Sequence, residues 1–153
     1  MFIFPWEWYF RSGDGQRECS ILVESRLIMT GYHAEGGILQ TLFAYLFYDI
    51  LFAYIPNVFQ TEFQTCPLDL YTEAFFPSRA SEIHHRLAEL SNGGAGRLIR
   101  EVNDRERDRR TCVVGLNWDF AVDDLLEIAD CFDGSALASI CIVMAQDYRQ
   151  RGG

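Results

Sequence analysis

The segment from Ile38 to Phe52 is apolar on nearly all of its faces. Its apolar pairs recur every four residues, as Ile38/Leu39, Leu42/Phe43, Leu46/Phe47 and Ile50/Leu51. A repeat close to the helical period predicts a helix, and apolar residues on the remaining faces predict burial all round. Pro56 has no N–H to donate and disfavours helix in the residue before it, so the helix is expected to stop there.

Further helices are indicated by one-sided apolar stripes. The first is expected over residues 78–90, ended by Asn92-Gly93-Gly94. The second, over residues 96–110, has a thin apolar stripe and alternating acids and arginines, which predicts a solvated helix. Another begins among Asp119, Asp123 and Asp124 and ends at Gly134. The last is capped by Ser135 and carries Leu137, Ile140, Cys141, Met144 and Tyr148 on one face.

Two segments between these helices lack a helical period. Residues 57–70 are expected to form a long but ordered loop, because their aromatic side chains would otherwise lie in water. Residues 111–116 are rich in β-prone side chains and predict a short strand. The pattern as a whole predicts a mainly α-helical segment with at most a short strand or hairpin.

Composition limits the functions that this segment performs by itself. The 153 residues are 49% hydrophobic and 14% aromatic, enough apolar material for one domain with a sizeable core. Every basic residue is an arginine, the net charge is -9 and the pI is near 4.7. Affinity for nucleic acid depends largely on basic side chains, so free-standing nucleic-acid binding is not expected.

The cysteines and the apolar segment 37–55 exclude two further classes. The five cysteines are widely spaced and form no Cys-x-x-Cys pair, which predicts reduced, mostly buried thiols rather than a disulfide framework or zinc site. Segment 37–55 carries Gln40, Thr41 and a central Asp49. A carboxylic acid is costly in lipid, so no transmembrane span is expected.

Glu35 is the candidate metal ligand of the sequence. It precedes a buried helix within Tyr32-His33-Ala34-Glu35-Gly36-Gly37, where a carboxylate could hold a hard cation through oxygen. From the residues alone, a favourable interaction with the helix dipole explains this glutamate better. His33-Ala34-Glu35 also fits the first element of zinc deaminases, but the required Pro-Cys-x-x-Cys does not follow.

Other polar residues favour structural roles over chemical ones. Asp49, inside the apolar helix, is expected to pair with an arginine or a backbone amide. Asp69, two residues after Pro67, is expected to bond its own backbone as a turn or cap. His84 and His85 point apart on a helix and are expected to be exposed. The arginines of residues 105–110 alternate with acids that nearly cancel their field.

Several motifs follow one another along the chain. They begin with Gly31-Tyr32-His33-Ala34-Glu35-Gly36-Gly37 and the apolar helix, and continue through Pro56-Asn57-Val58-Phe59, Cys66-Pro67-Leu68-Asp69-Leu70, Asn117-Trp118-Asp119-Phe120 and Asp147-Tyr148-Arg149-Gln150-Arg151-Gly152-Gly153. In this order they resemble the nuclease domain of the Fanconi-associated nucleases, most of all the fungal members. The resemblance covers residues 31–153. Residues 1–30 match poorly and are interpreted as a lead-in segment.

The resemblance implies the helical N-terminal part of a PD-(D/E)xK, restriction-endonuclease-like domain of the virus-type replication-repair nuclease kind. It also implies a structure-selective nuclease that cuts 5′ flaps and digests 5′ ends of DNA in interstrand crosslink repair. Such a protein is expected in the nucleus, with Mg²⁺ or Mn²⁺ as cofactor and branched or 5′-flap DNA as partner. Its protein partners are not indicated.

Within the resemblance, Glu35 aligns with the first metal-binding carboxylate of the family and is the one catalytic and metal residue assigned. The family's Pro-Asp and Glu-x-Lys follow the Arg-Gly-Gly at which these 153 residues stop, and the sequence has no lysine. One carboxylate holds Mg²⁺ poorly. We therefore expect these 153 residues alone to be inactive, as an incomplete gene prediction, a truncated copy or a fragment. The alternative is a non-catalytic helical interaction module derived from the nuclease.

Overall fold

The computed structural model describes residues 34–148 of the protein, with side chains from Gly37 onward. These residues form helices and no strand, which confirms the predicted mainly helical fold. The helices are α2 (Ala34–Leu46), α3 (Tyr48–Leu51), α4 (Phe75–Ser78), α5 (Ala80–Ser91), α6 (Ala95–Glu106), α7 (Val122–Cys131) and α8 (Gly134–Gln146). The lead-in predicted for residues 1–30 lies outside the described residues.

Helices α2 and α3 form the centre of the core, as the all-round apolar pattern predicted. Leu42, Phe43, Tyr45, Leu46 and Phe47 are each exposed by 1% or less. Burying one such large side chain stabilises a fold by about 1.5–3 kcal/mol. The helix breaks briefly at Phe47 and ends at Leu51, earlier than the proline that was expected to stop it.

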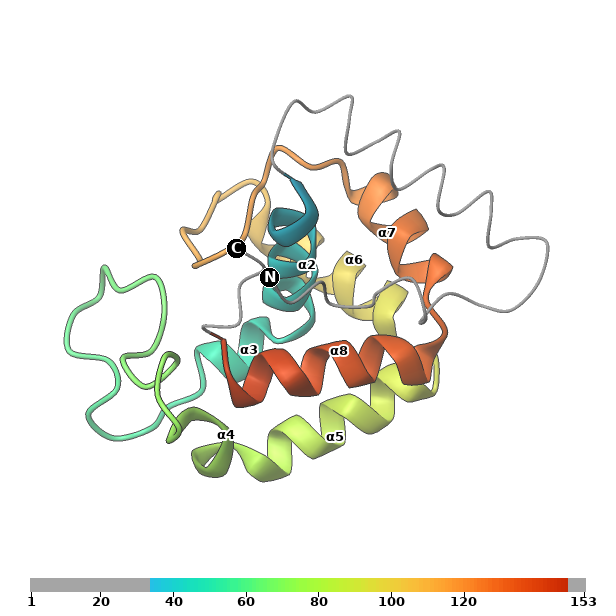
Figure 1. The fold of residues 1–153 in the computed structure, drawn as a ribbon. Coiled ribbons are helices and arrows are strands. Elements are labelled where there is room, and N and C mark those ends of the chain that lie inside the picture. Colours follow the sequence, from blue (N-terminus) through green and yellow to red (C-terminus); the bar gives the residue numbers. More distant parts are fainter. Residues whose placement is uncertain (1–33, 149–153) are drawn as a thin grey trace.

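The other helices surround this centre in two pairs. Helices α5 and α8 lie side by side and antiparallel, and α6 packs against α7 and against α2 (Figure 1). The stripes that predicted these helices face inward, with Ile83, Leu90, Ile99 and Leu125 each fully buried. The sequence therefore predicted the existence of the four longer helices after α2 correctly, and the structure refines where each one begins and ends.

Helix ends differ from the predictions in two places. Helix α7 ends at Cys131, before the glycine expected to end it, and α8 is capped by Asp133 rather than by Ser135. The Asp133 carboxylate accepts a hydrogen bond from the Ser135 amide at 3.3 Å. The end of α5 is as predicted, because Gly93 adopts a φ of 83° that glycine tolerates best.

The predicted strand over residues 111–116 does not form. Gly115 has a φ of 74°, which interrupts an extended backbone, and the segment turns instead of pairing as a ladder. Its link to the other irregular segment, residues 52–74, is a hydrogen bond from the Val114 amide to the Thr65 carbonyl at 3.0 Å.

The cysteines follow the prediction only in part. Cys141 is a buried free thiol and Cys112 an exposed free thiol, but Cys131 is disulfide-bonded, contrary to the expectation of reduced cysteines. Burial raises the pKa of the Cys141 thiol to about 12, against the lowering influence of Arg86. Among the described residues, no helix is both long and apolar enough to cross a membrane.

Candidate functional site

Glu35, the predicted metal ligand, lies in the first turn of α2. The structure describes its backbone as helical, and its side chain lies outside the described residues. The prediction that this carboxylate binds a metal therefore stays a prediction. The geometry around the site can be built from the residues of α2 that follow it and from the segments that contact them.

Thr41 of α2 forms hydrogen bonds to the segment 111–118. This threonine is fully buried, and its hydroxyl donates to the Gly115 carbonyl at 3.1 Å while accepting from the Asn117 amide at 3.2 Å. This one hydroxyl thus bonds two backbone groups of an irregular segment that is not paired in a β-sheet. The turn is held against the helix about two turns beyond Glu35.

Gly115 and Tyr148 meet at the same place. A Cβ added at Gly115 would overlap the Tyr148 hydroxyl and would lie 3.0 Å from the Cβ of Gln40, so only glycine fits there. The Tyr148 ring lies 5.6 Å from the Phe43 ring and 5.7 Å from the Tyr71 ring, measured between centroids. The end of α8 is therefore packed between α2 and the 52–74 segment.

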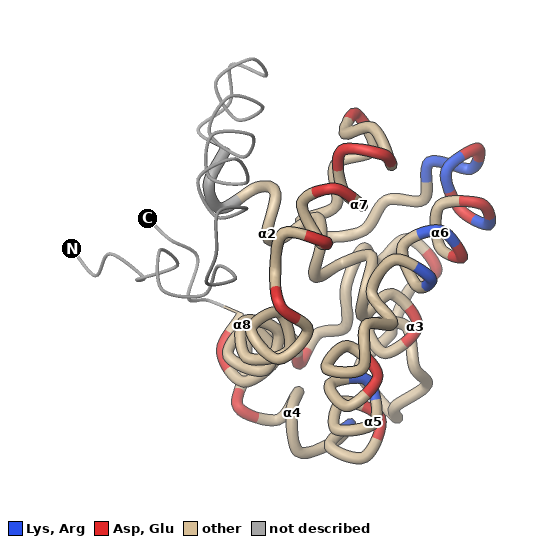
Figure 2. Tube along the Cα trace, turned by 90° about the vertical axis from the view of Figure 1, so that its right-hand side faces the viewer, with Lys and Arg blue, Asp and Glu red and all other residues tan. Residues whose placement is uncertain are grey.

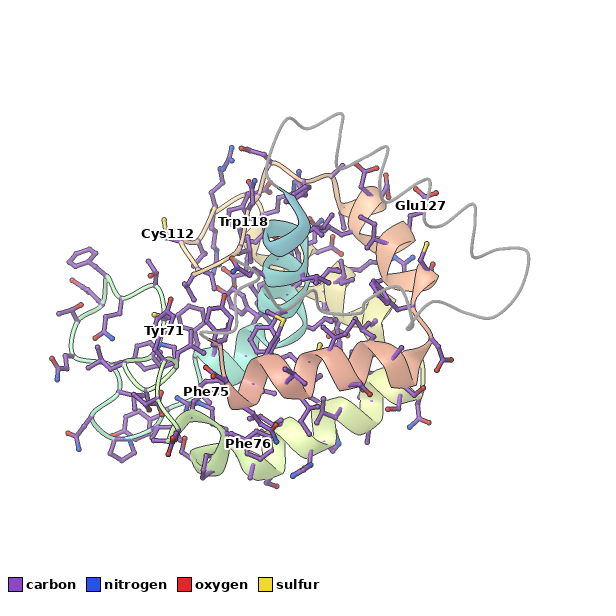
Figure 3. All side chains as sticks on the ribbon, in the orientation of Figure 1. Tyr71, Phe75, Phe76, Cys112, Trp118 and Glu127 are labelled. Carbon is purple, nitrogen blue, oxygen red and sulfur yellow. The ribbon has the colours of Figure 1, made fainter. Side chains whose placement is uncertain are left out.

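Trp118 closes another side of α2. Its ring meets Tyr45 edge-on at 5.5 Å, and its indole N–H donates to the Thr111 carbonyl at 2.8 Å. Figure 3 shows Trp118 beside α2. Burial raises the pKa of the Tyr45 phenol, while the nearby Arg107 cation acts in the opposite direction.

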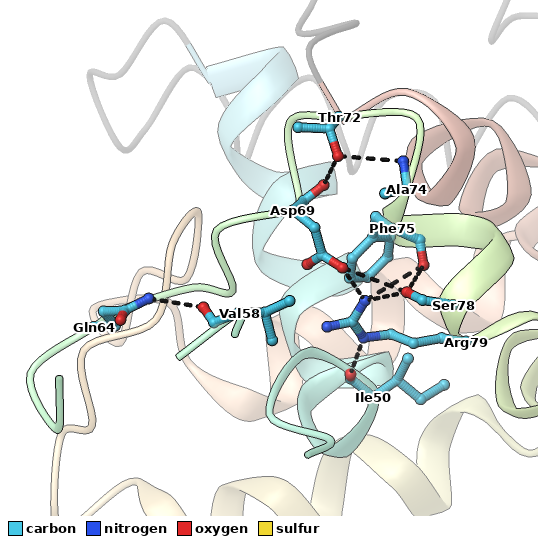
Figure 4. A network of polar contacts seen from close by, with 9 residues as sticks. All are labelled: Ile50, Val58, Gln64, Asp69, Thr72, Ala74, Phe75, Ser78 and Arg79. Carbon is cyan, nitrogen blue, oxygen red and sulfur yellow. Dashed lines mark hydrogen bonds and ion pairs between the residues drawn. The ribbon is translucent and has the colours of Figure 1, made fainter. Parts of the chain in front are cut away.

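Asp69 joins a buried network that holds the 52–74 segment to the helices (Figure 4). Its carboxylate pairs with the fully buried Arg79 at 2.8 Å, and Arg79 also donates to the Ile50 carbonyl at 3.2 Å. The Thr72 hydroxyl donates to the Asp69 carbonyl at 2.8 Å. A structural role for Asp69 is confirmed. The predicted bond to its own backbone was wrong, because its carboxylate pairs with the side chain of Arg79.

Asp49 forms the predicted ion pair. Both of its carboxylate oxygens accept from one nitrogen of Arg86, at 2.9 and 2.7 Å. Its side chain is 61% exposed, so the expectation that it lies deep in the apolar helix was wrong. Arg86 also donates to the Leu46 carbonyl, which the helix break at Phe47 leaves without its usual partner.

The arginines at the end of α6 are largely paired, in agreement with the predicted solvated helix. In Figure 2, the arginine positions of the described residues cluster along α6 and the turn after it, next to acidic positions. Arg97 pairs with Glu101, four residues further along the helix, at 2.6 Å. Arg110 binds Asp119 at 2.8 Å.

Glu106 is the acid of this region whose titration is shifted. Burial would raise its pKa, but hydrogen bonds from Thr111 at 2.8 Å and Arg105 at 2.9 Å stabilise the charged form, and the net pKa is lowered. His84 and His85 are exposed, as predicted, and His84 meets the Phe76 ring edge-on. Glu106 and His84 thus take part in contacts that support the fold.

The described residues do not form a metal cage by themselves. Among residues 37–148, no three His, Cys, Asp or Glu side chains are placed together to hold an ion. Mg²⁺ and Mn²⁺ favour several oxygen ligands, so the described side chains do not fit either cation. Sequence reasoning missed the contact of Thr41 with Gly115, for which the one signal was a glycine inside a β-prone run. Tyr148 was expected on the apolar face of the last helix, but its contact with Gly115 was not.

Comparison with known proteins identifies consistent similarities. The family profile described as "VRR-NUC domain" matches residues 94–153. The Fanconi-associated nuclease 1 homolog of Schizosaccharomyces pombe is 50% identical over 119 residues, covering 78% of this chain and 17% of that protein. The Arabidopsis thaliana homolog is 41% identical over 120 residues, covering 78% of this chain and 13% of that protein.

A solved structure agrees with these sequence similarities. The chain resembles the crystal structure of paFAN1 bound to DNA with a 2-nucleotide 5′ flap and a gap, with a TM-score of 0.64 and 28% identity. The match covers 74% of this chain and 21% of that one. The 153 residues therefore span a small part of the length of the proteins that they resemble.

Proposed function

Because this chain belongs to the Fanconi-associated nuclease family, we propose that it supplies the helical part of a metal-dependent DNA nuclease. The reaction is hydrolysis of phosphodiester bonds, by cutting 5′ flaps and digesting 5′ ends. The proposed setting is interstrand crosslink repair in the nucleus, and the proposed cofactor is Mg²⁺ or Mn²⁺. Glu35 is the metal ligand that this segment contributes.

The contact between α2 and Tyr148, which follows the end of α8, supports this proposal most directly. Tyr148 packs on Phe43, which lies eight residues beyond Glu35 on the same helix, about 12 Å along its axis. Five extended residues span at most roughly 17 Å. In the family, the Pro-Asp and Glu-x-Lys follow the Arg-Gly-Gly that occupies residues 151–153 here. Chain continuing past Tyr148 therefore starts within reach of the first turn of α2.

The 153 residues alone lack most of what such a nuclease needs. They contain no lysine, and Glu35 is the one family metal ligand that they carry. The described side chains offer no other metal cage. We derive no catalytic step through a metal from these residues, and the isolated polypeptide is proposed to be inactive.

A chimera tests the function. The aligned 119-residue segment of the S. pombe homolog is replaced by the matching residues of this chain. The expected result is Mn²⁺-dependent cleavage of a fluorescent 5′-flap DNA, lost by more than about 100-fold in Glu35→Gln, since even outer-shell changes at metal sites cost 10–100-fold. Asp49→Asn is the matched control. Asp49 has a structural role as the ion-pair partner of Arg86, so this substitution should leave cleavage unchanged.

Three results contradict the proposal. Equal cleavage by the parent chimera and Glu35→Gln removes the metal role of Glu35. A folded chimera that binds flap DNA but does not cut it favours the non-catalytic interaction module. For the isolated 153 residues, Glu35-dependent cleavage of the same substrate would falsify the proposed inactivity.

A further inference from the structure

The 52–74 segment exposes apolar side chains that the core does not use. Four large hydrophobic residues are strongly exposed among the described residues, and three of them lie in this segment: Tyr54 at 88%, Phe63 at 84% and Leu68 at 52%. The segment projects from the helices on the left of Figure 1. Phe63 belongs to the predicted ordered loop, residues 57–70, whose aromatics were expected to be covered, and it is exposed; Tyr54 precedes that loop.

The exposure does not reflect a loosely packed loop. The Gln64 side chain accepts hydrogen bonds from the amides of Gln60 and Thr61 and donates to the carbonyls of Val58 and Cys66. The Leu68 amide donates to the Val58 carbonyl at 3.0 Å, which closes the same turn. Phe63 is therefore presented by a turn whose backbone is fixed from inside.

The base of the segment is equally well held. Val58 and Leu70 are buried, Phe59 stacks on Phe52 at 5.9 Å between ring centroids, and Asp69 pairs with buried Arg79. The segment thus buries one set of apolar side chains and displays another. A rigid aromatic loses little conformational entropy when it is bound, which favours such residues as interface anchors.

Charge decides which kind of partner fits this surface. Residues 27–78 contain no arginine or lysine, and exposed Glu62 adjoins Phe63. DNA phosphates are repelled by such a surface, which disfavours a nucleic-acid partner. A second copy of this chain, at a net charge of -9, is also repelled. A protein surface with cationic groups around an apolar depression matches both the aromatics and the acid.

We propose that the exposed aromatic loop, residues 52–74, docks on a basic surface of the nuclease polypeptide outside the aligned segment. This inference rests on the proposed function: a DNA nuclease needs cations for phosphate binding, and this acidic segment must take them from the rest of the protein. Relatives have the necessary length, since the matched segment is 17% of the S. pombe homolog. Phe63 and Tyr54 are the anchors and Glu62 guides association.

Binding in trans tests the docking. The 153-residue chain is immobilised, and the probe is the S. pombe homolog lacking its own aligned 119 residues. Phe63→Ala and Tyr54→Ala are each expected to weaken binding by at least about 10-fold, as buried aromatic anchors do. Glu62→Gln is expected to slow association and reduce its salt dependence. Val143→Ala on α8, an exposed apolar residue outside the loop, is the control and should change nothing.

Several outcomes overturn the docking. They are no binding of the probe, binding that Phe63→Ala leaves intact, a loss of flap-DNA affinity in Phe63→Ala while probe binding stays normal, or a dimer of the chain that Phe63→Ala dissociates. Failure of the proposed function is a different result, because it appears as absent or Glu35-independent cleavage by the chimera while the probe still binds.

Discussion

Two regions each require a glycine at one position: the α5–α8 helix pair, and the junction at which Tyr148 packs against Gly115 and α2. The atoms that an added Cβ would meet differ between the two. At the start of α8, a Cβ on Gly134 would lie 2.6 Å from the Leu90 carbonyl oxygen and 2.8 Å from that of Ser91. At the junction, the nearest obstacle to a Cβ on Gly115 is the Tyr148 hydroxyl. The nearest obstacles in the helix pair are backbone atoms, whereas at the junction the nearest obstacle is a removable side-chain hydroxyl, added to the strain of the positive φ of Gly115.

The two regions therefore tolerate substitutions differently. The helix pair can adapt only by moving a helix, because backbone carbonyls cannot be replaced. The junction can exchange one contact for another, since a side-chain hydroxyl can be deleted without moving the chain. Substitutions at these positions separate the two behaviours.

The largest effect is expected where the helix pair is tied to α3. Arg79→Ala leaves the 11% exposed Asp69 carboxylate unpaired and removes the donor to the Ile50 carbonyl, which costs about 3–5 kcal/mol of unfolding free energy. Urea unfolding followed by circular dichroism measures it. Arg97→Ala, at a 57% exposed ion pair, is the control and should cost at most about 1 kcal/mol. Equal losses in the two variants would show that burial of the pair is unimportant.

Gly134→Ala is expected to come next. The new Cβ meets two backbone carbonyls, and such overpacking costs about 1–3 kcal/mol by the same unfolding assay. Gly37→Ala in α2 is the matched control, because nothing lies within 4 Å of its Cβ and alanine favours helix by about 0.5–1 kcal/mol. A neutral Gly134→Ala would mean that α5 and α8 separate without cost.

Gly115→Ala probes the junction. The φ of 74° alone costs an L-residue about 1–2 kcal/mol, and overlap with the Tyr148 hydroxyl adds to it. In a Tyr148→Phe background the overlap is gone, so the cost of Gly115→Ala should fall by at least about 0.5 kcal/mol. A double-mutant cycle measures this coupling, and additive losses would contradict the side-chain explanation.

The smallest effect is a pH dependence at Glu106. Its pKa is lowered from the usual 4.5, so its stabilisation is complete above that value and is lost as the pH falls through the folded-state pKa. Thr111→Val removes one hydrogen bond to the carboxylate. The stability gap between parent and variant should therefore narrow from pH 7 toward pH 3 in urea titrations. A gap that stays constant would show that the hydroxyl acts by packing alone.

Sequence reasoning succeeded where apolar residues recur along the chain with the period of a helix. The stripes of α5 and α8 and the all-round apolar run of α2 follow from the helical period, and the structure places them as expected. The resemblance to the nuclease family came from motif order and is confirmed by the comparisons, whereas the metal role that it implied for Glu35 stays a prediction.

It failed where contacts join residues far apart in sequence. Asp69 was expected to bond locally, yet its partner is Arg79 in a buried network that no spacing reveals. The 111–116 run has strand-forming side chains, but the position of Gly115 against Tyr148 requires a turn. Thr41 gave no signal, because a threonine in an apolar helix is ordinary until the chain that covers it is known.

The bonds of Thr41 carry a consequence for the speed of folding. Its hydroxyl bonds to Gly115 and Asn117, which lie 74 and 76 positions further along the chain. The loop that must close before these bonds form therefore includes most of the described residues. Helical proteins with mostly local contacts fold in microseconds to milliseconds, and distant contacts slow that rate. This α-helical chain should therefore fold more slowly than a simple bundle of its size, with the covering of α2 among its late steps.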